Sequence, residues 1–142
     1  MGDGSLVIRV RYADTDRMGV VYYANYYIWF EVGRTEILRS WGQDYKSLEE
    51  RGILLPVIES SAQYHAPARY DELLTVRTTL EHYRGARVAF NYKVENQNGA
   101  LLVSGRTHHA LTNLALRPIR APADLATLLN HFLLNEPYPQ SL

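Results

Sequence analysis

The chain has 142 residues, of which 46% are hydrophobic and 21% are charged, as expected of one soluble globular domain with a core of its own. Lysine plus arginine and aspartate plus glutamate are equal at 15 each, so the charge gives no reason to expect nucleic acid or an anionic membrane as a partner. The absence of cysteine excludes disulfides, thiolate metal sites and a cysteine nucleophile.

The length fits a single domain over residues 1–142, with residues 135–142 predicted to be a loose tail. The sequence shows no signal-peptide pattern and no apolar run long enough to span a membrane. We therefore expect a cytoplasmic protein.

The first predicted element is a strand over residues 6–12. Its residues alternate between one face made of Leu6, Ile8, Val10 and Tyr12 and another made of Val7, Arg9 and Arg11. This alternation is typical of a strand with one buried side.

A polar turn over residues 14–19 leads into a predicted helix that ends near Trp41, before Gly42. Between Val20 and Phe30 the only strongly polar residue is Asn25. We therefore expect the first two or three turns of this helix to be largely buried.

The second half of this helix is more polar and carries two features that the structure can test. Gly33 costs on the order of 1 kcal/mol relative to alanine, which predicts a close approach of the sheet or of a partner subunit. Glu31 and Arg34 have the spacing of an ion pair within the helix, although Glu31 could instead face a pocket. A short helix is expected over residues 44–51, closed by Gly52.

After residue 52 the pattern changes to the two-residue period of strands. Strands are predicted over residues 57–66, 73–83, 88–94 and 100–116, with turns at residues 84–85 and 96–99. An amphipathic helix follows Pro122. Because successive hairpins form an antiparallel sheet, we predict an α+β fold in which a curved antiparallel sheet wraps around the long helix.

The turn before the long helix holds two carboxylates, Asp14 and Asp16. A helix N-terminus carries unpaired N–H groups and the positive end of the helix dipole, so it can stabilise a carbonyl oxygen that becomes negative. A carboxylate beside it can serve as a base or a nucleophile. The alternative is that Asp14 or Asp16 only caps the helix or a turn.

Other kinds of site are not supported by the sequence. It contains no Gly-x-Ser-x-Gly elbow, no P-loop and no Gly-x-Gly-x-x-Gly fingerprint. His108 and His109 are adjacent in a predicted strand and point to opposite faces, so they cannot chelate one metal together, and no metal site is expected.

A longer motif around the turn resembles one found in the hotdog-fold acyl-CoA thioesterases. It reads Tyr12-x-Asp14-Thr15-Asp16-x-x-Gly19-Val20-Val21-Tyr22-Tyr23-x-Asn25-Tyr26, followed by Glu31-x-x-Arg34-x-Glu36-x-Leu38-Arg39. The resemblance is to the 4-hydroxybenzoyl-CoA thioesterase family and to the bacterial acyl-CoA thioester hydrolases linked to the Tol–Pal cluster. Residues 64–72 and 84–85 support it.

The resemblance implies a reaction, an assembly and roles for single residues. Hotdog proteins are dimers, often tetramers, with the acyl site at a subunit interface. Asp16 would be the catalytic carboxylate, which attacks the thioester carbonyl or activates a water, and Gly19 would permit the tight turn. The backbone N–H near Tyr23 would stabilise the oxyanion. No cofactor is implied beyond the coenzyme A (CoA) of the substrate.

The resemblance implies the class of acyl group less directly than it implies the reaction. Tyr22, Tyr26 and Tyr64 would line a pocket for a small aromatic or a short-to-medium aliphatic acyl group, with Glu31 as a further candidate. The Tol–Pal-linked branch commonly has histidine where this chain has Tyr23, whereas the 4-hydroxybenzoyl-CoA branch tends to have tyrosine. Candidates for holding the phosphates of CoA are Arg84, Arg87 and Arg117.

Two alternatives to hydrolysis stay open. A hotdog hydratase or dehydratase normally pairs a histidine with a carboxylate near the helix, and here no histidine precedes His65. A non-catalytic module that binds acyl-CoA or acyl carrier protein would keep the fold without the turnover.

Overall fold

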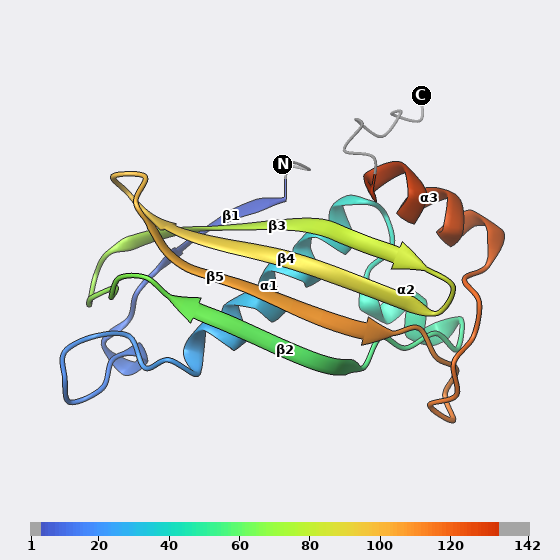
Figure 1. The fold of residues 1–142 in the computed structure, drawn as a ribbon, viewed down its shortest axis with the longest axis horizontal. Helices are drawn as coiled ribbons and strands as arrows, with labels where there is room; N and C mark the ends of the chain where they lie inside the picture. Colours follow the sequence, from blue (N-terminus) through green and yellow to red (C-terminus); the bar gives the residue numbers. More distant parts are fainter. Residues whose placement is uncertain (1–3, 134–142) are drawn as a thin grey trace.

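The fold is built on one antiparallel sheet, seen in a computed structural model that describes residues 4–133. Its strands are β1 (Ser5–Arg9), β2 (Val57–Tyr64), β3 (Leu73–Arg84), β4 (Arg87–Asn96) and β5 (Leu101–Ala110). They lie in the order β1-β3-β4-β5-β2, and each neighbouring pair is antiparallel (Figure 1). Strands β1 and β2 are therefore the two edges of the sheet.

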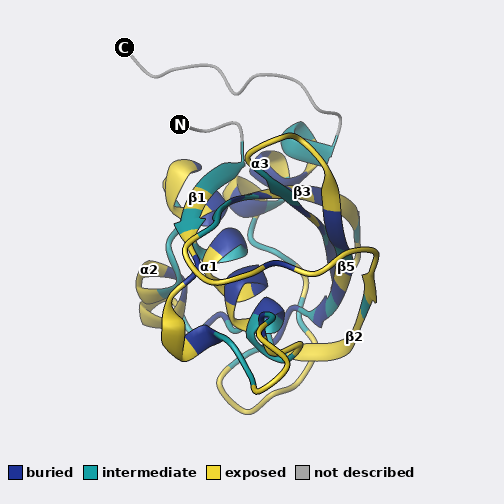
Figure 2. Ribbon diagram, turned by 90° about the vertical axis from the view of Figure 1, so that its left-hand side faces the viewer, coloured by how far each residue is buried: buried dark blue, intermediate teal, exposed yellow. Residues whose placement is uncertain are grey.

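The long helix α1 (Asn25–Ser40) lies on the concave side of this sheet and contacts β1, β3 and β4. Figure 2 shows α1 enclosed by the curve of the strands. Its buried residues are Tyr26, Trp29, Phe30, Gly33, Ile37 and Leu38. The predicted α+β architecture, a curved antiparallel sheet wrapped around one long helix, is confirmed.

The expectation that the first turns of α1 are largely buried holds for Tyr26, Trp29 and Phe30 but not for every apolar side chain. The helix begins at Asn25, because Val21 still belongs to the hairpin before it, where it forms an antiparallel bridge with Thr15. Ile28 is 55% exposed and Val32 is 36% exposed. The sheet of one chain covers only one side of the helix, so these apolar side chains face outward.

The predicted strands are present, but several are shorter than expected. Strand β1 stops at Arg9, and a 3-10 turn over Tyr12–Asp14 follows, so Tyr12 is 80% exposed instead of facing the core. Strand β2 ends at Tyr64, two residues early. Strand β5 ends at Ala110, because the Asn113 side chain then accepts the N–H groups of Ala115 and Arg117 in a turn.

The two remaining helices lie near the C-terminal end of α1, where Trp41 stacks on Phe132 of the last helix. Gly42 has a φ of +81°, and the N–H of Gln43 donates to the carbonyl of Leu38 at 2.9 Å, so the predicted glycine termination is confirmed. Helix α2 (Tyr45–Glu50) follows, with the Asp44 carboxylate accepting the N–H of Ser47 at 2.9 Å. Helix α3 (Ala123–Leu133) buries Leu125, Leu128 and Leu129, and it packs on β3.

Among residues 4–133, no helix combines the length and the apolar character needed to cross a membrane. The tail predicted over residues 135–142 lies outside the described residues.

Two glycines allow α1 to approach the sheet. A Cβ on Gly33 would overlap the side-chain oxygen of Thr78 on β3, so the close approach predicted at Gly33 is confirmed, and the sheet is what approaches. A Cβ on Gly105 of β5 would overlap the ring of Phe30. That ring is fully buried and stacks on Tyr92, with centroids 4.4 Å apart.

We expect Gly105→Ala to destabilise the protein by about 2 kcal/mol, because the added methyl group displaces a ring that has no free space to move into. Chemical denaturation measures this effect. The double variant Gly105→Ala with Phe30→Leu should lose less stability than the sum of the two single changes. Strict additivity would contradict the overlap between residues 30 and 105.

Candidate active site

A small hairpin presents Asp16 in front of α1. The N–H of Asp16 donates to the carbonyl of Val20, and the N–H of Gly19 donates to the carbonyl of Asp16, both at 2.9 Å. Gly19 has a φ of +80°, which explains why glycine stands in this turn. The Asp16 Oδ1 accepts the N–H of Met18 at 2.8 Å, so this carboxylate does cap a turn, with its second oxygen unbonded among the described residues.

Neither carboxylate caps α1. The N-cap position is Ala24, which has no side-chain cap. The first N–H bonds of the helix come from Asn25 and Tyr26, which donate to the carbonyls of Tyr22 and Tyr23. Within the described part of the chain, the N–H groups of Tyr23 and Ala24 donate to no acceptor. Free donors at the positive end of the helix dipole can stabilise a negatively charged oxygen.

Asp14 anchors the hairpin. Its carboxylate accepts the backbone N–H of Arg11 at 2.8 Å and the Arg11 guanidinium at 2.9 Å, and the residue is only 5% exposed. Burial alone would raise the pKa of this carboxyl, but the hydrogen bonds from Arg11 outweigh burial and lower the pKa. Asp14 is therefore occupied in holding the backbone, whereas Asp16 is partly exposed.

Four tyrosines gather beside this hairpin. Ring centroids lie 4.9 Å apart for Tyr22 and Tyr23, 6.3 Å for Tyr23 and Tyr64, and 5.7 Å for Tyr26 and Tyr64. Burial raises the pKa of Tyr26 to about 12, so its phenol stays protonated. The pKa of Tyr22 is raised mainly by Tyr23, with a smaller contribution from the carboxylate of Asp16. The structure thus brings together the predicted Asp16, Gly19, Tyr22, Tyr23, Tyr26 and Tyr64.

Glu31 is not among them. It lies on the exposed side of α1, and no hydrogen bond, ion pair or ring contact joins it to the tyrosines within residues 4–133. The ion pair predicted between Glu31 and Arg34 is also wrong. Arg34 turns inward instead, and its Nε donates to the hydroxyl of Tyr45 at 3.2 Å.

The three predicted arginines lie at the other end of the molecule. Arg84 and Arg87 face each other across the turn between β3 and β4, and Arg117 follows β5 in the chain. This turn is at the right-hand end of Figure 1, whereas the blue segment before α1 is at the left. Since β3 has 12 residues, its length alone separates the two ends by roughly 35 Å. One chain therefore does not place these arginines beside Asp16.

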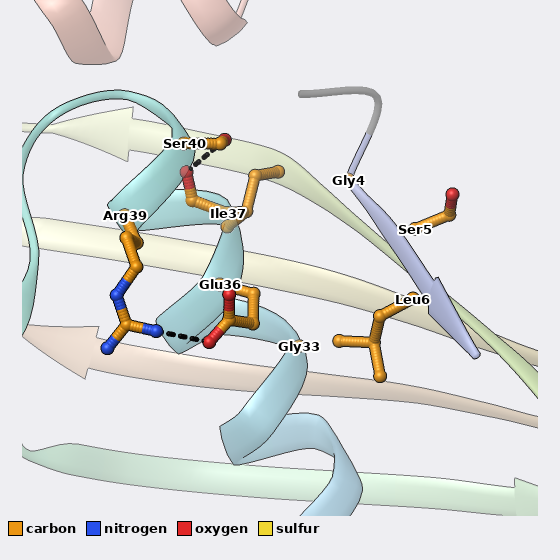
Figure 3. Close-up of a pocket in the computed structure, with 8 residues that line it drawn as sticks. All are labelled: Gly4, Ser5, Leu6, Gly33, Glu36, Ile37, Arg39 and Ser40. Atoms are coloured by element: carbon orange, nitrogen blue, oxygen red, sulfur yellow. Dashed lines mark hydrogen bonds and ion pairs between the residues drawn. The ribbon is translucent and has the colours of Figure 1, made fainter. Parts of the chain in front are cut away.

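A pocket of about 230 Å³ opens along the second half of α1, away from Asp16 (Figure 3). Its lining comes from the start of β1 and from the helix, where Arg39 forms an ion pair with Glu36. None of the predicted site residues lines it. Elsewhere in residues 4–133, no three acidic or histidine side chains are grouped so as to hold a metal ion.

One residue of this site was missed by sequence reasoning. The Nδ2 of Asn25 donates to the carbonyl of Asp14 at 2.8 Å and so joins the first residue of α1 to the base of the hairpin. The signal was present, because Asn25 is the only strongly polar residue between Val20 and Phe30. Its partner could not be read from the sequence.

The curved antiparallel sheet wrapped around the long helix α1 is the architecture of the hotdog fold. The chain belongs to the thioesterase superfamily, whose family model matches residues 18–103. A putative acyl-CoA thioesterase of Bacillus subtilis, YneP, is 40% identical over 102 residues, which cover 72% of this chain and 74% of the relative.

Solved structures agree with this membership. A hypothetical protein of Thermus thermophilus, TT1821, is 37% identical, with a TM-score of 0.86 over 90% of this chain and 98% of its own. The DHNA-CoA thioesterase of Staphylococcus aureus is 32% identical, with a TM-score of 0.84 over 89% of this chain and 87% of its own.

Proposed function

We propose that the protein hydrolyses the thioester of a small aromatic or short-to-medium aliphatic acyl-CoA, with Asp16 as base or nucleophile. The observation that carries this proposal is the position of Asp16, in a hairpin directly before α1, where the N–H groups of Tyr23 and Ala24 have no acceptor within the described residues. The N–H groups of Tyr23 and Ala24 are the proposed oxyanion donors. Family membership supplies the reaction class.

In the general-base route, Asp16 takes a proton from a water as the water oxygen attacks the thioester carbon. The carbonyl oxygen becomes negative and is stabilised by the free N–H groups. The C–S bond then breaks, and the thiolate of CoA leaves and takes up a proton. In the nucleophilic route Asp16 attacks first and forms an anhydride that water opens. Both routes give acid and free CoA without a further cofactor.

The tyrosines support the proposed acyl class. Their faces and edges form an apolar wall beside Asp16, which suits an aryl ring or a short alkyl chain. The hydroxyl of Tyr64 donates to the carbonyl of Tyr23 at 3.4 Å, and this contact ties β2 to the segment that carries the proposed oxyanion donors.

We propose further that the active form is a homodimer or a tetramer built on pairs of chains joined along β2. This edge strand is exposed along nearly its whole length, and Val57 and Ile58 are each 46% exposed. The apolar Ile28 and Val32 of α1 are also uncovered. Two identical edges that pair antiparallel form a two-fold interface. A mass of two or four chains by sedimentation equilibrium is expected.

This pairing gives the distant arginines a role. In an antiparallel pair, the Val57 end of one β2 lies beside the Tyr64 end of the other. The turn at Arg84 and Arg87 is on the Val57 side of the sheet, because Val57 pairs with His109 and Arg87 pairs with Ala110. A second copy would therefore bring Arg84, Arg87 and Arg117 towards the Asp16 end of the first, where they could bind the phosphates of CoA.

The test is thiol release from a panel of aromatic and aliphatic acyl-CoAs. We expect turnover to be concentrated on one of these classes, since a single tyrosine-lined wall cannot suit every chain length. The matched control is each free acid with CoA, which must release no new thiol. Binding of acyl-CoA without turnover on any member would support the non-catalytic module instead.

A further inference from the structure

The base of the Asp16 hairpin is held by an unusual arrangement of donors. The carbonyl of Asp14 accepts two hydrogen bonds, one from the N–H of Tyr22 at 2.9 Å and one from the Nδ2 of Asn25 at 2.8 Å. The carboxylate of the same residue is held by Arg11. Asp14 is thus fixed at both its backbone and its side chain.

The bond from Asn25 closes a loop that contains the whole proposed catalytic apparatus. Asp14 and Asn25 are eleven residues apart, and between them lie Asp16 and the free N–H groups of Tyr23 and Ala24. The bridge between Thr15 and Val21 fixes the hairpin internally but does not fix it against the helix. Among the described residues, Asn25 makes the only side-chain hydrogen bond from α1 to the hairpin.

Asn25 also differs from an ordinary residue at a helix start. Asparagine near a helix N-terminus commonly accepts a hydrogen bond from the helix's own N–H groups. Here its carboxamide donates backwards to the carbonyl of Asp14, and the first N–H groups of α1 donate to the carbonyls of Tyr22, Tyr23 and Ala24. The side chain of Asn25 therefore ties the start of α1, next to the proposed oxyanion donors of Tyr23 and Ala24, to the segment that carries the carboxylate.

We propose that Asn25 is a positioning residue, which holds the carboxylate of Asp16 in register with the free N–H groups at the start of α1. This inference rests on the proposed thioester hydrolysis. Attack on a thioester needs the carboxylate on one side of the carbonyl carbon while the donors hold its oxygen, so a shift of about 1 Å between hairpin and helix can cost about a hundredfold in rate.

Asn25→Ala is expected to lower kcat by about 10- to 100-fold and to leave KM within about threefold, because the acyl-binding tyrosines are untouched. Amide hydrogen exchange should rise for the N–H of Tyr22, which shares the Asp14 carbonyl, and stay unchanged in the second half of α1. The matched control is Asn91→Ala. The Asn91 amide reaches only Glu81, at 3.5 Å, on the exposed face of the sheet, and its loss should change neither kcat nor exchange at Tyr22.

A double-mutant cycle with Asp16→Asn separates positioning from general damage. If Asn25 acts through Asp16, Asn25→Ala should cost little more in the Asp16→Asn background, measured by single turnover at high enzyme concentration. A purely structural role would cost the same factor in both backgrounds, and that result would overturn the proposal. So would a kcat within twofold of the parent, or unchanged exchange at Tyr22.

A second variant covers the case in which Asn25→Ala does not fold. Asn25→Asp keeps the shape of the side chain, removes its N–H donor and adds a negative charge that stabilises a helix N-terminus. It should therefore fold and yet lose the hydrogen bond to the carbonyl of Asp14. The same kcat and exchange criteria then apply to it. Failure of the proposed function gives a different pattern: the parent would show no turnover on the whole panel, or Asp16→Asn would keep full activity, whatever Asn25 does.

Discussion

Asp16→Asn should lower kcat by about a thousandfold, the order expected when a proton-transferring carboxylate is lost. Asparagine is the informative replacement. Its side-chain oxygen can still accept the N–H of Met18, a bond of 2.8 Å in the parent, so the turn is kept while the group can no longer take a proton or attack. Thiol release on the best acyl-CoA of the panel measures the loss, with KM expected to change little.

Asp71→Asn is the control for this change. Asp71 is an exposed carboxylate that pairs weakly with Arg9 at 3.5 Å, and its φ of 71° is one that asparagine also tolerates. Its turnover should equal that of the parent. An Asp16→Asn variant that kept more than a third of the parent kcat would show that the chemistry has been assigned to the wrong residue.

The second large effect concerns His109 of β5, which has no exposed surface and meets the ring of Phe90 edge to face. Its Nδ1 is 2.9 Å from the carbonyl of Leu55, and its Nε2 is 2.8 Å from the hydroxyl of Thr107. Burial lowers the pKa of His109 from 6.5 to about 4. The imidazole is therefore neutral at pH 7, with its proton on Nδ1, because a carbonyl can only accept.

This lowered pKa makes stability depend on pH in a defined direction. Between pH 4 and 6.5 the unfolded chain binds a proton at His109 and the folded protein does not, so the free energy of unfolding rises with pH over this range. The contribution of the neutral His109 imidazole to the free energy of unfolding is complete above about pH 6.5, and it is lost as the pH falls to 4. It amounts to about 3 kcal/mol by the usual conversion of pKa shifts.

Urea denaturation across this range is the measurement. His109→Gln can keep a donor and an acceptor without titrating, so its stability should vary by much less between pH 4 and 6.5. His108→Gln, at the neighbouring position and 3.7 Å from Glu59, should retain the pH dependence of the parent. An equal slope in the parent and in His109→Gln would exclude His109 as its source.

The sequence predicted the fold well because its signals are local. Two-residue alternation located the strands, and Gly42, Gly85 and Gly99 marked turns where φ is positive. The errors arose where local patterns depend on distant contacts. An apolar helix side predicts burial but does not show what covers it, and the sheet of one chain leaves Ile28 and Val32 exposed.

The predictions for the site residues also separate into those set by local sequence and those set by distant contacts. The placement of Asp16, Gly19, Tyr22, Tyr23 and Tyr26 follows from a single continuous motif, and Tyr64 joins them from β2. The bond from Asn25 to Asp14 depends on how a hairpin folds back on a helix, and the distance of Arg84 from Asp16 depends on the direction of β3. Neither can be read from residue spacing, because each is set by three-dimensional packing.

The exposed edge of β2 also affects how the protein behaves on dilution. In its eight residues, Val57–Tyr64, Glu59 is the only charged side chain, so the strand has little to prevent it from pairing with any extended chain. Assembly along β2 would hide this edge, and a separated chain would expose it as a starting point for aggregation. The thermal midpoint should therefore increase with protein concentration, as mass action requires of a folded state that is stabilised by its own copy.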